Sequence, residues 1–311
     1  MDRDLSIAAV IPAFNAAATL RRAIASVLSQ TEPPQQTVVV DDGSTDATAA
    51  VASEYGSAVC VVRQQNQGAS AARNRGLAEC RTTAVAFLDA DDEWLPLKLA
   101  QQRTIFRNHP ELKWCFTHMV EVHGGQVQEQ VLPPDIAAQL KERPVMPYLV
   151  AAERDLSTGT CGAVLRLDVV RAAGGFNPTR RIAEDRDLWW RIAMSHPDIG
   201  YGPDVAWRYH TDTPSSLMKT SPDRSDSLRV VCEHLRWWRR EQRVEFERYG
   251  RRLALNYLAR AAARQIYVER AVLADAESLL GLSTGRRALL AAIRYLPRPL
   301  ARPLVARLPD R

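Results

Sequence analysis

The sequence predicts an α/β fold, with a mostly parallel central sheet flanked by helices and a mostly helical C-terminal extension. Two observations lead to this class. Short apolar runs alternate with helix-length segments over the first half of the 311-residue chain, and repeated strand-helix units build parallel sheets with right-handed crossovers. From about residue 225 the pattern is helical. We therefore expect an α/β domain over residues 1–224 and a helical extension over residues 225–311.

The first half of this domain is expected to contain four strands joined by helices. Apolar runs predict strands at residues 6–13, 37–40, 58–62 and 84–88. Residues 19–29 carry apolar side chains at the 3.6-residue spacing of an amphipathic helix, and a further helix is expected at residues 69–80. Gly43 permits a tight turn after the second strand, and residues 44–46 can cap the helix that follows.

The second half of the domain is expected to mix strands and helices. Helices are predicted from Pro96 to about residue 109, at 168–173 and at 186–195. Strands are predicted at residues 113–119, 159–167 and 205–210. Gly124 and Gly125 indicate a hairpin turn, and the prolines within residues 133–153 predict a loop with short helices.

The composition is that of an ordinary globular protein, with 46% apolar residues. No apolar run approaches the roughly eighteen residues of a membrane-spanning helix, and the N-terminal MDRDLS lacks the apolar region of a signal peptide. A cytoplasmic location is therefore expected. The five cysteines are scattered without a CxxC pair, which argues against a zinc ribbon or a disulfide framework and predicts reduced core residues.

The net charge of +5 is unevenly distributed. Residues 225–311 contain 18 arginines, no lysine and 9 acidic residues, whereas the first 224 residues carry 23 basic and 27 acidic ones. Such a division suggests that the two parts meet different partners. The extension, which includes Trp237 and Trp238, suits peripheral contact with an anionic membrane surface at its inner face. A solvated helix surface over a packed bundle is the alternative.

Acidic residues follow two of the predicted strands. The fourth strand runs directly into Asp89, Asp91 and Asp92, and the second ends in Asp41 and Asp42. Carboxylates at the carboxyl ends of parallel strands lie where open α/β sheets bind ligands. Asp89 and Asp91 can converge on one hard cation, Mg²⁺ or Mn²⁺, which would carry a diphosphate. The alternative is an acidic loop that caps the next helix.

Five segments occur in an order that resembles a known family. They are VIPAFN, VVVDDGSTD, NQGASAARNRGL, FLDADDEW, and GGFN followed by AEDRDLWWR, over roughly residues 7–210. This order closely resembles family 2 of the inverting GT-A glycosyltransferases, whose fold is Rossmann-like. The resemblance implies a nucleotide-binding half at residues 1–110 and an acceptor-binding half at residues 111–224. It also implies a nucleotide-sugar donor, in particular a UDP-sugar, and Mn²⁺ or Mg²⁺ as cofactor.

The resemblance assigns residues to the nucleobase. It implies that Pro12, Ala13 and Phe14 line the base pocket, and that Asp42 or its neighbour Asp41 accepts a hydrogen bond from the base or ribose. A pyrimidine offers one ring N–H and a flat face, which a carboxylate and an aromatic ring satisfy together. The alternative is that both aspartates only shape the turn.

Further residues are assigned to the diphosphate and the metal by the same resemblance. Arg73 corresponds to a family position near the donor, where a fixed cation pairs with the diphosphate or packs on the base; a solvated helix face is the alternative. Asp89 and Asp91 match the family's DxD, whose first acid contacts ribose or metal and whose last acid ligates the metal. Asp92 is expected to be an acid at a helix start. His210 follows a strand where family members carry a histidine near the diphosphate or metal.

Asp185 matches the aspartate of the family's ED motif, which deprotonates the acceptor hydroxyl as general base. That hydroxyl then attacks the anomeric carbon with inversion. The alternative is that Glu184 and Asp185 are simply first-turn acids that favour a helix N-terminus. Of the following Trp189 and Trp190, we expect one in the core and the other facing an acceptor sugar.

The resemblance therefore implies metal-assisted transfer of a sugar to a hydroxyl of a glycan or lipid-linked acceptor, in polysaccharide biosynthesis. A Mg²⁺-dependent phosphohydrolase also uses DxD after a strand, but typically after the first strand rather than the fourth. A nucleic-acid-binding protein acting through the extension, which is rich in Arg and Trp, is a third interpretation. It leaves the acidic clusters unexplained, so no nucleic-acid partner is expected.

Overall fold

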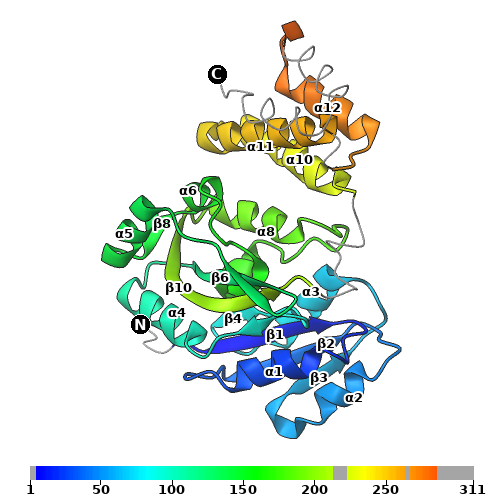
Figure 1. Ribbon diagram of the computed structural model, residues 1–311, viewed down its shortest axis with the longest axis vertical. Helices are drawn as coiled ribbons and strands as arrows, with labels where there is room; N and C mark the ends of the chain where they lie inside the picture. The colour runs from blue at the N-terminus through cyan, green and yellow to red at the C-terminus, as the bar shows by residue number, and fades with distance from the viewer. Residues whose placement is uncertain (1–4, 213–222, 264–265, 286–311) are drawn as a thin grey trace. The chain divides into compact units, whose positions relative to one another are not determined.

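The computed structural model describes residues 5–212, 223–263 and 266–285 (Figure 1). The chain divides into two compact units, Met1–Thr213 and Pro214–Arg311. In the second unit, helix α10 (Ser225–Arg240) begins at the residue where the sequence predicts the helical extension to start. The end of that predicted extension, residues 286–311, lies outside the described residues.

Four parallel strands form one half of the sheet in the N-terminal unit. They are β1 (Ile7–Ala13), β2 (Gln36–Asp41), β3 (Cys60–Arg63) and β4 (Ala84–Phe87), in the spatial order β3-β2-β1-β4. Every residue of β1 and β4 is buried, as is typical of parallel strands covered on both faces. Because the pairings are parallel, β1, β2 and β4 all end at one edge of the sheet.

Helices cover both faces of this half, and β1 shows how. Side chains alternate between the two faces of a strand. Ile7, Ala9 and Ile11 share one buried cluster with the apolar residues of α1 (Leu20–Leu28). On the other face, α3 (Ala69–Glu79) approaches so closely that a Cβ on Gly76 would lie 2.3 Å from a Val10 methyl carbon.

The other half of the sheet mixes strand directions. β9 (Val164–Arg166) lies between β4 and β6 (Trp114–His123) and runs antiparallel to both. β10 (Asp198–His210) runs parallel to β6 with two register shifts. Three shorter strands pair antiparallel with β6 or β10: β5 (Glu93–Trp94), β7 (Gln126–Glu129) and β8 (Val145–Pro147). The predicted α/β class is confirmed, with the parallel pairing concentrated in the first four strands.

The described part of this unit contains further helices, and two predictions about which side chains are buried are wrong. The helices are α2 (Thr48–Ser53), α4 (Lys98–Asn108), α5 (Pro134–Glu142), α6 (Tyr148–Glu153), α7 (Leu167–Ala172) and α8 (Glu184–Ala193). Trp189 and Trp190 on α8 are both buried, because Trp189 joins an aromatic cluster with Trp114, so neither can face a sugar. Cys60 is exposed, because β3 is the edge strand of the sheet.

The described part of the second unit contains three helices that pack on one another: α10, α11 (Val244–Ala262) and α12 (Arg270–Leu280). Gly250 on α11 allows close approach, because a Cβ there would lie 2.6 Å from the Trp238 ring. Arginines of α10 pair with acids of the same unit, Arg236 with Asp275 among them. Among the described residues, no helix has the length and apolar character required to cross a membrane.

Candidate active site

Arg73 joins two acidic segments that are far apart in the sequence. It projects from α3 and is only 4% exposed. Its Nη2 donates to Asp89 Oδ1 at 2.7 Å, and its Nη1 donates to Glu184 Oε1 at 2.8 Å. The Phe176 ring centroid lies 5.3 Å from the guanidinium carbon. The structure therefore places Arg73 between the predicted DxD and ED motifs, rather than on the solvated helix face that was its alternative.

Burial and ion pairing have opposite effects on the pKa values of Arg73 and Glu184. Burial acts to lower the pKa of Arg73, but the nearby Asp89 and Glu184 carboxylates outweigh it and raise the pKa. Burial raises the pKa of Glu184, while Arg73 opposes the rise and Asp185 adds to it. The guanidinium thus stays charged and is the group that stabilises an ionised Glu184.

Asp185 lies in the first turn of α8, directly after Glu184. The residue that precedes this pair, Ala183, has a left-handed backbone with φ of +61°, a conformation that non-glycine residues seldom adopt and that recurs at functional sites. The Asp185 side chain is partly exposed, and its Oδ1 accepts the N–H of Arg186 at 2.6 Å. A first-turn acid and a general base are both compatible with this placement.

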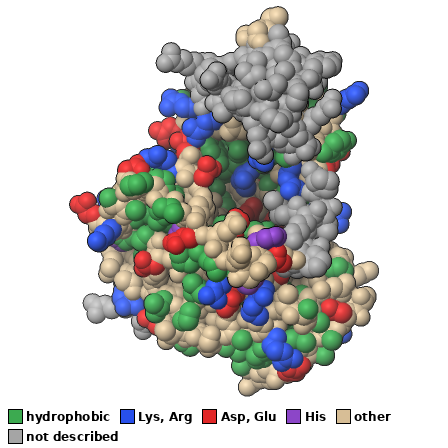
Figure 2. All heavy atoms as spheres, in the orientation of Figure 1, with side chains coloured by type: hydrophobic (Ala, Val, Ile, Leu, Met, Phe, Trp, Pro, Cys, Tyr) green, Lys and Arg blue, Asp and Glu red, His purple; other side chains and the backbone are tan. Residues whose placement is uncertain are grey.

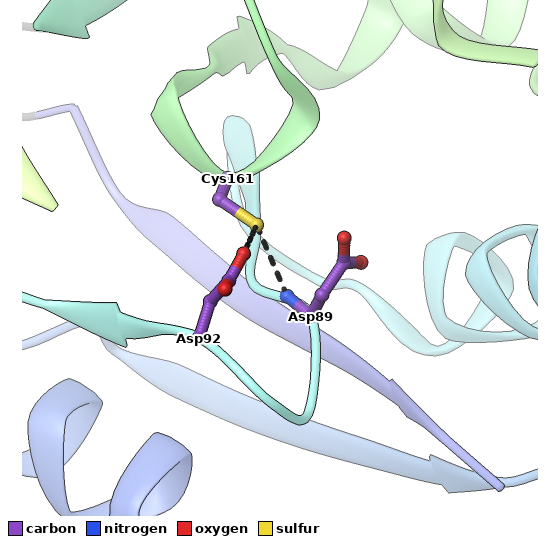
Figure 3. Close-up of side chains that lie close together, drawn as sticks. All are labelled: Asp89, Asp92 and Cys161. Carbon is purple, nitrogen blue, oxygen red and sulfur yellow. Dashed lines mark hydrogen bonds between the residues drawn. The ribbon is translucent and has the colours of Figure 1, made fainter. Parts of the chain in front are cut away.

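The acids that follow β4 form a tight turn next to a buried thiol (Figure 3). Potential metal-ligand atoms of Asp89, Asp92 and Cys161 lie within 4.8 Å of one another. Among the described residues, these three form the cluster whose side chains could together hold a metal ion. Asp91 and His210, both predicted as metal ligands, are not members of it. Asp92 is not a helix-start acid, because it is 1% exposed and precedes β5.

His210 ends β10 and is tied to the same turn. Its backbone N–H donates to Asp92 Oδ1 at 3.0 Å. Its ring Nε2 lies 3.5 Å from Glu93 Oε2 and, among the described residues, makes no well-aligned hydrogen bond. Burial lowers the pKa of His210, the Arg22 charge lowers it further, and Glu93 opposes both. The hydrogen bond to Asp92 places His210 next to the turn, and the lowered pKa favours the neutral imidazole, which is the form that binds metals.

The residues around the turn fit a divalent cation. The Asp89 side chain is 36% exposed and has one carboxylate oxygen on Arg73, so its other oxygen is left for a ligand. Carboxylate oxygens suit Mg²⁺ and Mn²⁺, and a neutral imidazole adds a donor that Mn²⁺ accepts. The ligand set Asp89, Asp91 and His210 stays a prediction.

The residues predicted to line the base pocket lie at the ends of β1 and β2. Pro12 and Ala13 are buried, whereas Phe14, in the loop after β1, is 49% exposed and presents its ring at the surface. The loops are joined, because the N–H of Asn15 donates to Ser44 Oγ at 2.9 Å. Phe14 is thus the residue of this group whose side chain is open to a ligand.

Asp41 and Asp42 are both buried and both organise the loops around them. Asp41 accepts the N–H of Ser44 at 3.0 Å and Arg63 Nε at 2.9 Å. Asp42 Oδ1 accepts Gln64 Nε2 and a backbone N–H, and its Oδ2 accepts the N–H of Gly68 at 2.8 Å. Since a carboxylate oxygen can accept two hydrogen bonds, Asp42 Oδ2 keeps capacity for one more.

The N-terminal unit has a face of mixed charge. In Figure 2, acidic, basic and histidine side chains lie close together on the N-terminal unit. Sequence reasoning identified Asp89, Arg73 and Glu184 but not their mutual contacts, and it missed Cys161 entirely. No local signal marks Cys161, because its partners lie about 70 positions earlier in the chain.

The sheet thus carries an aspartate turn after β4, and Arg73 links this turn to Glu184 at the start of α8. Residues 8–131 match the family model described as glycosyl transferase family 2. Over these residues, about two fifths of the chain, the sequence is similar to that family.

Curated relatives agree with this assignment. A pre-mycofactocin glycosyltransferase of Mycobacterium tuberculosis is 30% identical over 211 residues, which cover 65% of this chain and 41% of the relative. An uncharacterized glycosyltransferase of Nostoc sp. is 40% identical over 107 residues, which cover 33% of each protein. The chain thus spans about two fifths or less of the length of these relatives.

Solved structures confirm the GT-A fold. TarS 1-349 of S. aureus in complex with UDP-GlcNAc superposes with a TM-score of 0.69 at 17% identity, over 97% of this chain and 91% of that one. A mannosyltransferase of Pyrobaculum calidifontis in complex with GDP-Man and Mn²⁺ gives a TM-score of 0.59 at 19% identity, over 97% and 84%.

Proposed function

We propose that this protein transfers a sugar from a nucleotide diphosphate sugar to a hydroxyl of a glycan or lipid-linked acceptor, with inversion. The position of Arg73 between Asp89 and Glu184 is the observation that supports this most directly. The Arg73 guanidinium contacts both the turn assigned to the donor and Glu184, which is next to Asp185, the proposed general base. A donor and an acceptor hydroxyl can therefore meet between these two segments.

The donor side rests on the loops after β1, β2 and β4. The exposed Phe14 ring would stack on the base, and Asp42 Oδ2 would accept its ring N–H. Uridine fits this pair, and the structural similarity to TarS, which was solved in complex with UDP-GlcNAc, supports UDP as the nucleotide. Mn²⁺ or Mg²⁺ bound by Asp89, Asp91 and His210 would stabilise the negative charge that develops on the leaving diphosphate.

The acceptor side rests on Asp185. Its carboxylate takes the proton from the acceptor hydroxyl as the hydroxyl oxygen bonds to the anomeric carbon. The bond between that carbon and the phosphate oxygen breaks on the opposite face, so the nucleoside diphosphate leaves and the configuration inverts. Arg73 holds Glu184 and thereby the start of α8, which carries Asp185.

A thermal-shift panel of UDP, GDP, CDP and ADP, with and without Mn²⁺, tests the donor assignment. We expect UDP with Mn²⁺ to raise the melting temperature most, because a ligand that binds only the folded state stabilises it. Sugar release from the matching UDP-sugars, followed by chromatography, then tests the chemistry. A wild-type protein that no nucleotide stabilises would contradict the proposal.

The helical unit has a separate proposed role in peripheral membrane contact at the cytoplasmic face. The sugar acceptor of the protein would then be lipid-linked. Arg229, Arg236 and Arg239 pair with acids of their own unit, which reduces the attraction of these three arginines to an anionic membrane and to a polynucleotide alike. Co-sedimentation of the full chain with anionic but not neutral liposomes would support membrane contact, and equal behaviour with both would rule it out.

A further inference from the structure

Cys161 bridges two parts of the aspartate turn. It lies in the short 3₁₀ turn Thr160–Gly162 and is buried. The backbone N–H of Asp89 donates to Cys161 Sγ at 3.3 Å, and the thiol donates to Asp92 Oδ2 at 3.2 Å (Figure 3). One sulfur therefore accepts from the start of the turn and donates to its end.

Asp92 extends this bridge to β10. Its second oxygen, Oδ1, accepts the backbone N–H of His210 at 3.0 Å. Within the described residues, no arginine, lysine or histidine side chain pairs with this carboxylate, and a buried carboxylate is held in place by the hydrogen bonds it receives. A chain of three hydrogen bonds thus runs from Asp89 through Cys161 and Asp92 to His210.

The turn that carries Cys161 is itself held firmly. Trp94 Nε1 donates to the Cys161 carbonyl at 2.9 Å, and Gln102 Nε2 donates to the Gly162 carbonyl at 2.9 Å. Gly162 has no room for a side chain, because a Cβ would lie 2.8 Å from Trp207 Nε1. The thiol is therefore presented to the aspartate turn from a rigid support.

We propose that Cys161 is a positioning residue that aligns Asp89 with His210 through Asp92. The inference rests on the proposed function, because it assigns Asp89 and His210 to the metal. It differs from a role for Cys161 as a metal ligand. The thiol is occupied on both sides by hydrogen bonds, and the Asp89 carboxylate points away from it in Figure 3.

The test compares Cys161→Ala, Cys161→Ser and Cys80→Ala in the full-length protein. Cys80 is a matched control, because it is also a buried free thiol of the N-terminal unit, and it donates to the Gly76 carbonyl within α3 rather than to the aspartate turn. Mn²⁺ affinity in the presence of UDP is measured from the free Mn²⁺ signal in electron paramagnetic resonance. Hydrogen-deuterium exchange is followed in peptides covering residues 88–95.

We expect Cys161→Ala to weaken Mn²⁺ binding by about 10- to 100-fold, the usual effect of losing a group that orients metal ligands. Exchange in residues 88–95 should become faster. Cys161→Ser should restore most of both properties, since a hydroxyl can donate and accept as the thiol does. Cys80→Ala should leave both unchanged.

Three results would overturn the inference. Unchanged exchange in Cys161→Ala would show that the bridge does not hold the turn, and a serine variant as weak as the alanine variant would remove its hydrogen-bonding basis. A thiolate-to-metal absorption band that Cd²⁺ produces in the wild type but not in Cys161→Ala would make Cys161 a ligand. If the wild type binds neither Mn²⁺ nor UDP, the proposed function fails, while the exchange data still decide whether the bridge exists.

Discussion

Replacing Arg73 with methionine tests the link between the two acidic segments. Methionine fills similar space but leaves Glu184, whose side chain is 16% exposed, without its cation. Breaking a buried ion pair costs about 3–5 kcal/mol. The contact with Asp89 adds little, because that side chain is 36% exposed and screened by water. We therefore expect a loss of about 3 kcal/mol, or roughly 6–12 °C in melting temperature for a unit of this size.

The pH dependence gives this prediction a second measurement. Burial already raises the pKa of Glu184, and losing Arg73 raises it further. A carboxyl with a higher pKa in the folded state takes up a proton on folding, so the folded state loses stability as pH rises through that range. The difference in melting temperature between Arg73→Met and the wild type should be large at neutral pH. It should become smaller as the pH falls toward the ordinary pKa of glutamate.

Thermal unfolding at several pH values is the assay, with two further variants. Adding Glu184→Gln to Arg73→Met removes the unpaired charge and should recover part of the loss. Arg21→Met is the control, because the ion pair between Arg21 and Glu54 is exposed at both ends and should matter little. An Arg73→Met protein that melts like the wild type, or a gap that stays constant with pH, would refute the reasoning.

Of four other substitutions, two test the chemistry of the site and two test the stability of the fold. Asp185→Asn should lower kcat for sugar transfer by about 10²- to 10⁴-fold, as loss of a general base does, with UDP binding unchanged in a thermal-shift assay. Asp91→Ala should abolish the stabilisation by UDP that depends on Mn²⁺ while the metal-free melting temperature stays the same. Burial lowers the pKa of Lys98 to about 7. Between that pH and roughly 10, the lysine is protonated mainly in the unfolded chain. The stability of the wild type relative to Lys98→Met should therefore rise as the pH increases through this range. Gly43→Ala should destabilise the protein by about 1–3 kcal/mol in urea unfolding, because Gly43 has φ of +77° and a Cβ would lie 2.8 Å from the Asn66 nitrogen.

The sequence was most informative where a structural rule acts over a few adjacent residues. β1 and β4 were predicted because parallel strands buried on both faces appear as continuous apolar runs, and Asp89 was placed correctly at the end of such a run. The helix of residues 19–29 was predicted from its spacing and corresponds to α1. These features depend on local chemistry, which is why sequence reasoning finds them.

Features that depend on distant partners were not predictable in this way. Asp92 resembles a helix-start acid in its local context, yet a thiol 69 positions later and a backbone N–H 118 positions later determine its role. One of Trp189 and Trp190 was expected to face a sugar, yet tertiary packing buries both. The strand that brings Cys161 to the site, β9, enters the sheet between two strands that precede it in the chain, and no periodicity encodes that choice.

Asp89 is the residue at which these distant contacts converge. Arg73 holds one oxygen of its carboxylate, and Cys161 accepts its backbone N–H. Two independent supports, one from α3 and one from the 3₁₀ turn before β9, therefore fix the side chain and the backbone of the same residue. A ligand site held in this way loses little conformational freedom on binding. Removing either support should consequently weaken cation binding, and removing both should cost less than the sum of the two effects, because they restrain one group.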